Sequence, residues 1–560
     1  MFIIVSKYIF QIRDTYKLQI HIELKMEFTQ EEVDILKRYV SSTSSNIFVL
    51  TGLPGIIGAA FARYSRASAG VRETLLREFI IDGNIDSKKA DGFIRRILLA
   101  YGDDSVGELE GAHLALEQIS ILATKEIEDR RIGGSPIEQS TRYVEYDTKD
   151  ENGRFRFLRE QNVMNSEFGG LYESTLTRVF EIYADIIPKL KEFFKKIKPL
   201  SEAEYAIKLN DLDKYNFSEL NDDVERKAFM RTYETDIKTK SCDTARFLLP
   251  AATFTNMGVF ANGRYFQNLL THLYTLGVSE MNDIAKKSHQ ALDTVMMQYV
   301  KRAEKNEYLS EIELKMQILV DSLLKGVQPN NETEVVLLDN PRTDSEYINS
   351  LISVMIYSYS KHPMRQLRKI VSELPQEKKA EIIETYIGDR HNRRNRPGRA
   401  LEFGYPLTFD LIGDFGIYRD LERHRILTQQ RQRLGTELGY VIPPEIEEAG
   451  LKNKVEEAFE KSDKLYHLLK KDFSYESQYA VLLGYNVRWT FGMNPREAGH
   501  LMELRTIPQG HHNYRTLTRE MSNQVLLRYP ELSSLLKFVD HNNYYWGRAD
   551  SEAGQRRKGG

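Results

Sequence analysis

The sequence predicts an α+β protein built from two homologous domains, each with a layer of helices packed on a mixed β-sheet. Three observations favour this fold class. Amphipathic helical periodicity dominates the chain, strand-like runs are short, and landmarks of the first half recur in the same order in the second half. With 560 residues, the chain is also too long for one small core, so two or more domains are expected.

Helices are predicted wherever apolar residues recur at helical spacing after a capping residue. This pattern predicts helices over Thr29–Val40, Asp86–Tyr101 and Leu171–Ile197, the last interrupted at Pro188. Short apolar runs followed by Gly or Pro predict strands at Ile47–Leu50 and Val335–Leu338. The polar segment 328–332 contains a proline and is the best linker candidate.

The composition is that of a globular protein, with 41% hydrophobic and 28% charged residues. A net charge of −3 gives no general attraction to nucleic acid, so nucleic-acid binding is not expected. The single cysteine, Cys242, excludes an internal disulfide and a Cys-rich zinc site, and it favours a reducing cytoplasm. No apolar run is long enough to cross a membrane, and no metal site is expected.

An internal repeat is visible in the spacing of charged landmarks. Glu108 precedes Arg131 by the same interval as Glu402 precedes Arg425. Further along, Asn262-Gly263-Arg264 is matched by Asn494-Pro495-Arg496. The stretch between the two landmarks is much longer in the first half than in the second, so the first half carries an insertion. We interpret this insertion as a charged helical surface element.

The repeat leads to a division of the chain into five segments. The predicted segments are an N-terminal extension and helix at 1–45, a first domain at 46–305 with its insertion at about 150–235, a linker at 306–334, a second domain at 335–540, and a polar tail at 541–560.

The loop Gly133-Gly134-Ser135-Pro136 and the residues after it resemble a phosphate-binding loop. Ser140 and Arg142 lie two residues apart, close to Glu138. A hydroxyl, a guanidinium and free backbone N–H groups are what a phosphate monoester needs. The alternative is an ordinary turn with one salt bridge, and spacing alone does not separate the two interpretations.

Two further segments carry clustered cations. Arg423-His424-Arg425 suits a diphosphate or an electron-rich ring, and the alternative is a solvated helix end. In the segment 494–505, helical spacing directs Arg496, His500 and Arg505 towards one side. Arginines on a helix are usually solvated, so this segment by itself favours a structural interpretation.

Taken together, these segments resemble the flavin-dependent thymidylate synthases. That family's hallmark is R-H-R-x-x-S-x-N-x-x-S-x-R, followed by A-R-x-x-L-P and then by N-x-R-x-L-x-N-x-x-x-L-R. The end of the hallmark matches residues 138–143 and the middle block matches 245–250, whereas the start of the hallmark matches 423–425. The last block is matched in part by both halves, at 262–268 and at 494–505.

The resemblance implies a flavin enzyme that methylates dUMP to dTMP. It implies FAD as cofactor, with NADPH and methylenetetrahydrofolate as co-substrates. Arg505 is the implied catalytic residue, and the implied dUMP ligands are Glu138, Ser140, Arg142 and Arg246. The implied FAD ligands are Arg423, His424, Arg425, Asn494 and Arg496, with His500, Asn262, Arg264 and Asn268 as weaker candidates.

The departures from the family pattern are complementary between the halves. The first half has Leu273 where the second has Arg505. The second half has Gly435 and Gln478 where the first has Arg142 and Arg246. In this family the active site lies between the subunits of a tetramer. We therefore expect one composite site built from both halves, and a homodimer of tandem chains. The alternative is a catalytically inactive scaffold that binds flavin or nucleotide.

Other features leave the reaction open. The family usually has Glu-His upstream, but the corresponding second positions here are Leu109 and Phe403, so the carbon donor is not determined. A flavin-dependent pyrimidine hydroxymethylase is the second enzymatic hypothesis. Cys242 has no nucleophile-like partners in its sequence context. The basic run 390–399 is interpreted as a solvated loop, with polyanion contact as the alternative.

Overall fold

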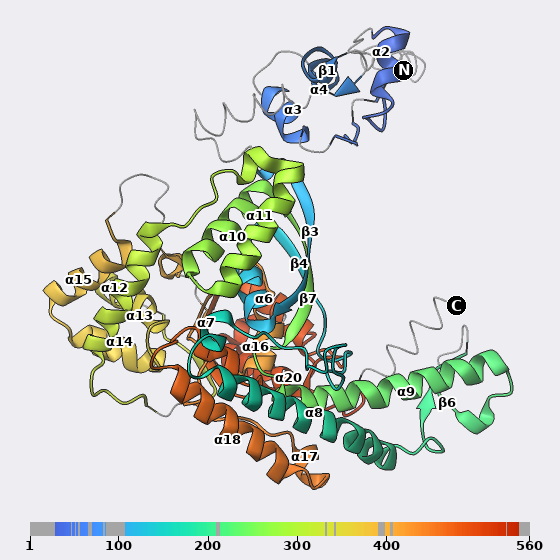
Figure 1. The fold of residues 1–560 in the computed structure, drawn as a ribbon, viewed down its shortest axis with the longest axis vertical. Coiled ribbons are helices and arrows are strands. Elements are labelled where there is room, and N and C mark those ends of the chain that lie inside the picture. The colour runs from blue at the N-terminus through green and yellow to red at the C-terminus, as the bar shows by residue number, and fades with distance from the viewer. Residues whose placement is uncertain are drawn as a thin grey trace, which may run out of the picture. The chain divides into compact units, whose positions relative to one another are not determined.

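The computed structural model divides the chain into two compact units, Met1–Glu110 and Gly111–Gly560, and each is described by itself (Figure 1). The residues that the structure describes are 28–45, 47–50, 52–53, 56–64, 70–81, 84–85, 107–208, 213–330, 333–340, 343–389, 398–403, 407–533 and 535–547.

The first unit contains short elements. Helix α2 (Gln30–Leu36) begins at a capping box made by Thr29 and Glu32, which confirms the predicted start. It is followed by α3 (Ile57–Tyr64), α4 (Val71–Thr74), η1 (Leu75–Phe79) and a β1–β2 pair (Ile80–Ile81 and Asn84–Ile85). The strand predicted at 47–50 is wrong, because only Leu50 pairs there, in one bridge to Val40. The helix predicted at 86–101 lies outside the described residues.

Two antiparallel sheets organise the second unit. The first sheet has the order β3-β7-β4, made of Gly111–Ser120, Phe254–Asn262 and Gly134–Glu138. The second has the order β10-β11-β9-β8, made of Thr428–Arg431, Asn486–Met493, Leu407–Asp414 and Val335–Leu337. Strand β8 confirms the strand predicted at 335–338.

The helices repeat in the same order around both sheets. Strand β3 leads into α6 (Ile121–Glu128) as β9 leads into α16 (Phe415–Leu421). Strand β7 leads into α10 (Gly263–Leu276) and α11 (Ser279–Val300), as β11 leads into α19 (Pro495–Arg505) and α20 (His512–Arg528). Even the caps recur: Asn262 and Asn494 cap α10 and α19. The tandem duplication predicted from the sequence is therefore visible in the structure.

The α+β class is confirmed, but the expectation of a mixed sheet is not met. Every strand pairing among the described residues is antiparallel. The reason is the position of β7, which pairs antiparallel with both β3 and β4 and so lies between them. The two strands joined through α6 run parallel to each other without being neighbours.

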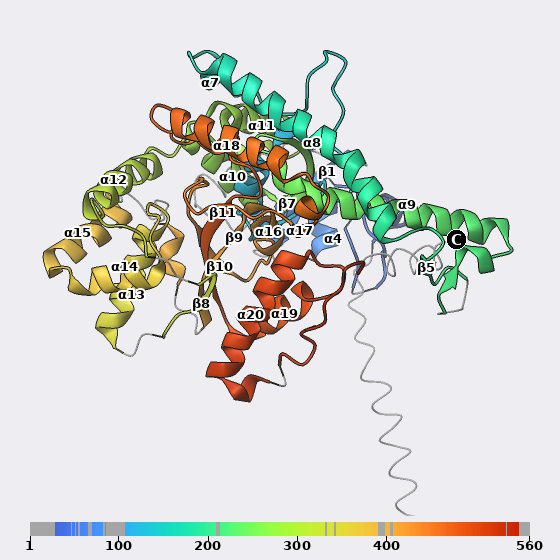
Figure 2. The ribbon, with the colours of Figure 1, turned by 90° about the horizontal axis from the view of Figure 1, so that it is seen from below.

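The halves differ most between the second and third strands of the repeat. The first half has α7 (Gln161–Met164), α8 (Gly169–Ile197), β5 (Glu204–Tyr205), β6 (Tyr215–Asn216), η4 (Phe217–Glu219), α9 (Asp223–Ala245) and η5 (Arg246–Leu248). The second half has only α17 (Pro444–Glu448), α18 (Lys452–Leu469) and η7 (Glu476–Ala480) among the described residues. Helix α8 packs on α9 and on α18, as Figures 1 and 2 both show.

Helix α8 runs through Pro188 without the predicted interruption. Proline removes one backbone hydrogen bond from a helix interior. On both sides of it, however, apolar side chains such as Tyr183, Ile187 and Leu190 are buried. Their burial outweighs the local cost, so the helix continues to Ile197.

A separate helical cluster covers one end of the second sheet (Figure 2). It consists of α12 (Glu307–Leu323), α13 (Asp344–Tyr357), α14 (Met364–Glu373), α15 (Gln376–Ile387) and η6 (Arg399–Glu402). Outside this cluster, a last short helix, η8 (Pro530–Leu532), follows α20. Helix α12 occupies most of the predicted linker. Val336, Leu338 and Phe403 join the apolar core of this cluster, so the Phe403 ring is packed inside the protein.

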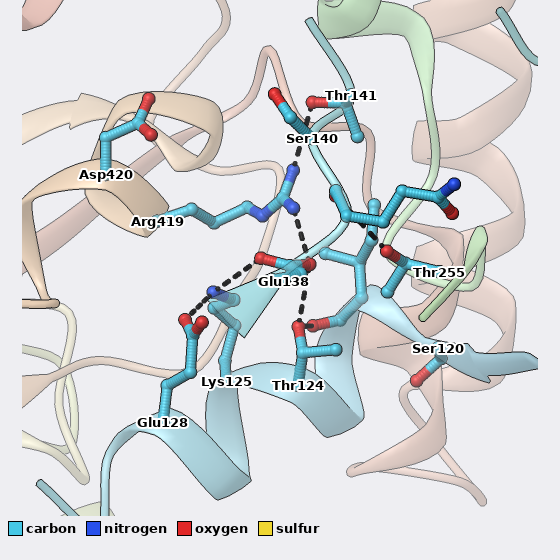
Figure 3. A network of polar contacts seen from close by, with 12 residues as sticks. Ser120, Thr124, Lys125, Glu128, Glu138, Ser140, Thr141, Thr255, Arg419 and Asp420 are labelled. Atoms are coloured by element: carbon cyan, nitrogen blue, oxygen red, sulfur yellow. Dashed lines mark hydrogen bonds and ion pairs between the residues drawn. The ribbon is translucent and has the colours of Figure 1, made fainter. Parts of the chain in front are cut away.

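A buried ionic cluster, hereafter the Glu138 cluster, joins the two repeats (Figure 3). Its members are Thr124, Lys125 and Glu128 of α6, Glu138 of β4, and Arg419, Glu422 and Arg423 in and after α16. Figure 3 shows Thr124, Lys125, Glu128 and Arg419 around Glu138. Glu138 accepts hydrogen bonds from Thr124 (3.0 Å), Lys125 (3.2 Å), Arg419 (2.6 Å) and Arg423 (3.0 Å). Lys125 also pairs with Glu128, and with Glu422 at 2.8 Å.

Burial works against ionised carboxylates, and the neighbours decide the outcome. For Glu138, burial alone would raise the pKa, but Arg419, Lys125 and Arg423 together lower the pKa to about 2. For Glu422, burial raises the pKa to about 8, because Lys125 is shared and Glu128 and Asp129 repel a further charge. Glu138 is thus the permanent anion of the cluster, and Glu422 is its titrating member.

The contribution of Glu422 to stability should fall as the pH rises from about 5 to about 8. Between the ordinary glutamate pKa of 4.5 and the folded value of about 8, the folded state holds one proton more at Glu422, so deprotonation favours unfolding. Glu422→Gln should therefore raise the melting temperature at high pH and change it little in mild acid. Thermal melts across this range test it, with exposed Glu447→Gln as control. An equal shift for Glu422→Gln at both ends of the range would contradict it.

Candidate functional site

Asp420, at the end of α16, lies among four arginines that the two repeats contribute. Burial alone would raise the pKa of its carboxyl, but the cations hold it well below the usual range; they are Arg246, Arg423, Arg142 and Arg505, in decreasing order of influence. The direct contact is with Arg246, whose Nη1 lies 3.4 Å from Asp420 Oδ2. This convergence of cations on one carboxylate defines the candidate site.

The first repeat supplies Arg142 and Arg246. Arg142 follows β4 and forms two parallel hydrogen bonds to Asp243, at 2.5 Å from Nε and 2.7 Å from Nη2. Arg246 begins η5 directly after α9. Both side chains are almost fully buried, so their charges are screened little by solvent.

The second repeat supplies the remaining groups at the ends of its helices. Asp420 and Arg423 lie at the end of α16, and Arg505 ends α19. His511 caps the start of α20. Burial and the nearby Arg246 and Arg142 hold the pKa of His511 well below its usual value, so its imidazole is neutral at pH 7.

A small pocket lies between the two repeats at this point, with about 290 Å³ of empty space including its open mouth. Its polar lining is Asp243, Arg246, Asp414, His511 and Asn513. Gly416 also lines it, and a Cβ added there would lie 2.9 Å from Asp414 Oδ1 and 3.6 Å from Arg246 Nη2. The glycine therefore keeps the space beside Arg246 open.

The predicted Arg-His-Arg segment divides into three different environments. Arg423 donates to Glu138 and keeps 38% of its side chain exposed. His424 is buried between Glu497 and Arg505. Arg425 is exposed and donates to Ser135 Oγ at 2.8 Å, which links the segment to the first repeat. The segment thus borders the Glu138 cluster, the arginines and open solvent.

The other predicted FAD ligands lie on two helices. On α19, Asn494 caps the helix, Arg496 and His500 are exposed, and the His500 ring centroid lies 5.4 Å from that of His424. On α10, Asn262 is again the cap, with Arg264 partly buried and Asn268 exposed. Helix α19 contacts the Arg-His-Arg segment through His424. Helix α10 is the corresponding helix of the first repeat, so its three residues belong to the other repeat.

Glu138 and Ser140, both predicted dUMP ligands, differ in accessibility. Ser140 is half-buried, and its Oγ accepts a hydrogen bond from the backbone N–H of Arg142 at 3.3 Å. Glu138 has no exposed side-chain surface and four protein donors around it. A carboxylate so enclosed cannot contact a ligand without a rearrangement, whereas it does hold Arg423.

In the second repeat, the segment that corresponds to the predicted phosphate loop is residues 431–435, and its side chains and backbone contact other parts of the protein. A Cβ at Gly435 would lie 2.1 Å from Glu437 Oε2, so no arginine fits there without rearrangement. Gln478 accepts a hydrogen bond from Leu434 N at 3.0 Å, and Arg433 pairs with Glu313 at 2.8 Å. Leu273 is fully buried in α10. At this copy the residues that differ from the family pattern serve packing.

Three groups at the site were missed by the sequence analysis, namely Asp243, Asp420 and His511. The two aspartates each lie three residues before a predicted site arginine, Arg246 and Arg423. That spacing does not reveal their partners, because Asp243 pairs with Arg142 and Asp420 with Arg246. His511 had no signal in the sequence either, because its position depends on how α20 returns to the pocket.

Other sequence expectations concern groups outside this site. Burial raises the pKa of the Cys242 thiol to about 12, so it is not a thiolate at neutral pH. Most of the basic run, 390–397, lies outside the described residues, and Arg399 at its end donates to Asp129 at 2.6 Å. Among the described residues, no helix is long and apolar enough to cross a membrane, and no metal-binding group of His, Cys, Asp or Glu is present.

The chain is similar over nearly its whole length to two curated relatives. Relatives named UPF0159 protein are 36% identical in Chlamydia muridarum, over 95% of this chain and 99% of the relative, and 31% identical in Thermoplasma acidophilum, over 90% and 99%. A solved structure, thymidylate synthase X from Helicobacter pylori with FAD and dUMP, is 20% identical and covers 44% of this chain and 96% of its own, with a TM-score of 0.25.

The family model described as thymidylate synthase complementing protein matches in two segments, residues 55–296 and 343–531. The first match runs from the first unit through β3, α6, β4, β7, α10 and most of α11, and the second covers β9, α16, β10, β11, α19 and α20. The chain therefore belongs to the thymidylate synthase complementing protein family, as a tandem duplication, and the resemblance to flavin-dependent thymidylate synthases is confirmed.

Proposed function

We propose that the chain is a cytoplasmic flavin-dependent thymidylate synthase that methylates dUMP to dTMP at a composite site between its two repeats. Family membership supports the reaction class. The observation that carries the proposal is the arrangement around Asp420, where Arg142 and Arg246 of the first repeat meet Arg423 and Arg505 of the second. These are the residues that each half retains from the family pattern.

Arg142 and Arg246 bind the phosphate of dUMP in this proposal. Both are buried cations, and a buried guanidinium binds a phosphate dianion through charge-assisted hydrogen bonds. Without substrate, Asp243 and Asp420 balance their charge. The Arg246–Asp420 contact is long, at 3.4 Å, so Arg246 is held less tightly than Arg142, which forms two short hydrogen bonds to Asp243. The Ser140 hydroxyl completes the phosphate ligands.

Arg505 stabilises the pyrimidine as it becomes charged. A guanidinium already fixed near the ring favours the ionised form without reorganisation during the reaction. Burial lowers the pKa of Arg505, with Asp420 opposing, and the side chain remains protonated at neutral pH. Glu138, predicted as a dUMP ligand, instead acts through Arg423, which it holds by a 3.0 Å hydrogen bond.

The donor set of the second repeat fits FAD. Arg425, Arg496 and His500 are exposed and polar, and the His500 ring centroid lies 5.4 Å from that of the buried His424. Exposed cations suit a diphosphate. Arg423, Arg425, Asn494, Arg496 and His500 would hold FAD, with Asn262, Arg264 and Asn268 of the other repeat as secondary contacts. His424, also predicted as an FAD ligand, is buried with both ring nitrogens bonded to Glu497 and Arg505, so it supports the site from within the protein. Reduced flavin supplies the hydride, NADPH serves as reductant, and methylenetetrahydrofolate as carbon donor.

Purified protein should take up FAD and convert dUMP to dTMP. The physical reason is the accessible cationic surface of α19 beside the arginines of the composite site. Flavin absorbance during titration measures uptake, and mass spectrometry of the nucleotide identifies the product. A hydroxymethylated product would support the hydroxymethylase hypothesis. That hypothesis is considered because Leu109 and Phe403 stand where the family has a histidine. Bound FAD without any product would indicate an inactive scaffold.

Substitutions in the two repeats should separate substrate binding from turnover. Arg142→Ala or Arg246→Ala removes one charged hydrogen bond to phosphate, roughly 1.5–3 kcal/mol, and should weaken dUMP binding by about ten- to a hundred-fold. Arg505→Ala should mainly lower kcat, because its contact is strongest in the charged intermediate. Calorimetry of dUMP binding and steady-state kinetics measure the two effects.

Arg433→Ala is the matched control for this series. Arg433 occupies the position of Ser140 in the filled copy of the phosphate loop and pairs there with Glu313 at 2.8 Å. We expect dUMP affinity to change little in this variant. Equal losses from Arg142→Ala and Arg433→Ala would refute the composite site and indicate two equivalent sites.

The chain should assemble as a homodimer. Two tandem chains contain four repeats, which reproduces the number of units in the family's tetramer, and closed dimers are the commonest assembly. Light scattering coupled to gel filtration should give twice the 65.1 kDa chain mass. A stable monomer at working concentration, with or without FAD, would contradict this expectation.

A further inference from the structure

Arg505 is connected to Glu497 through His424. Arg505 Nε donates to His424 Nε2 at 2.9 Å, and His424 Nδ1 lies 2.8 Å from Glu497 Oε1. The His424 side chain is 3% exposed and the Glu497 side chain 7% exposed. The three side chains therefore form a mostly buried linear chain that ends at the arginine of the composite site.

The chemistry of the donors determines the state of the imidazole. An arginine Nε always carries a hydrogen, so His424 Nε2 must be the acceptor and cannot carry a proton. The ring proton then lies on Nδ1 and is donated to the Glu497 carboxylate, which can only accept. One neutral tautomer satisfies the whole chain, and protonation of His424 would break its bond to Arg505.

The surroundings favour this neutral form. Burial lowers the pKa of His424, Arg505 and His500 lower it further, and Glu497 raises it in part. The charged or titratable groups that face His424 are thus Glu497, His500 and Arg505 of α19, with Arg423 and Arg425 as chain neighbours. At neutral pH the ring acts as an acceptor towards Arg505.

We propose that Glu497 is a positioning residue for Arg505. By accepting the Nδ1 proton, Glu497 holds His424 in the tautomer that fixes the Arg505 guanidinium. The inference rests on the proposed function only for the role of Arg505, because the hydrogen-bond chain exists independently of it. A long arginine side chain needs such an acceptor to keep one orientation, and fixed orientation is what electrostatic stabilisation of a transition state requires.

The local use of Glu497 supports a dedicated role. It occupies the third position of α19, where its backbone N–H donates to the cap Asn494 at 3.0 Å. In a capping box, a glutamate at this position turns its carboxylate back to the cap backbone. Here Oε1 reaches His424 instead. Only the carboxylate is needed for the chain, so the cap can remain when the side chain is changed.

The first test measures the pKa of His424 directly, from the pH dependence of hydrogen exchange at the imidazole C2 position, read by mass spectrometry of the full-length protein. Glu497→Gln should lower the pKa, because the carboxylate that favours the charged ring is lost. Arg505→Gln should raise it, because a repelling cation is lost. Glu503→Gln is the control: the same change on the same helix, at a carboxylate that bonds Phe538 N. It should leave the pKa unchanged.

The second test is kinetic. A glutamine can accept from Nδ1 or donate to it, so Glu497→Gln allows the wrong tautomer and should lower kcat about ten- to a hundred-fold. The affinity for dUMP should change less than twofold, since Arg142 and Arg246 are untouched. The acid limb of the kcat profile should move to lower pH together with the pKa of His424, and Glu503→Gln should retain wild-type kcat.

The outcomes are distinguishable. Unchanged pKa of His424 in both Glu497→Gln and Arg505→Gln overturns the hydrogen-bond chain. Shifted pKa with wild-type kcat in Glu497→Gln overturns the positioning role. A wild-type protein that binds FAD but makes no product contradicts the proposed function, and the pKa series still decides whether Glu497 and His424 hold Arg505.

Discussion

The ion pairs around Glu138 are the interaction on which the arrangement of the two repeats depends. Its carboxylate belongs to the first repeat, and two of its four donors, Arg419 and Arg423, belong to the second. A buried charge without partners is costly, so neither repeat can move away without leaving Glu138 or the arginines unpaired. The phosphate-loop residues after Glu138 and the Arg-His-Arg segment are thereby held at a constant separation.

The two copies of the face between the repeats differ in how their charged residues are paired. Around Asp420, Arg246 makes only a long contact to the carboxylate, at 3.4 Å, whereas Arg142 is held by two short hydrogen bonds to Asp243. At the corresponding face of the other copy, Arg433 pairs with Glu313, and a side chain at Gly435 would require Glu437 and its neighbours to move. In the proposed composite site, one face of the fused chain binds the ligand and the other face is filled by protein contacts.

The position of Arg505 illustrates how a motif residue depends on neighbours outside the motif. Its Nε is bound to His424, which is in turn oriented by Glu497 in the first turn of α19. The same logic applies to Arg423, which Glu138 holds from the opposite repeat. In both cases a carboxylate determines where a cation points, and the cation carries the proposed chemistry.

Local patterns in the sequence determined the cap at Thr29, the strand at 335–338, the long helix ending at Ile197 and the order of the motifs in both halves. These features depend on residues close together in the chain. Tertiary structure decided what local patterns cannot: that α8 continues through Pro188, that β7 separates β3 from β4, and that Asp420 lies among the arginines. Those outcomes depend on burial and on ion pairs such as Glu138–Arg419 and Arg246–Asp420, whose partners are 281 and 174 residues apart, and no local spacing encodes such contacts.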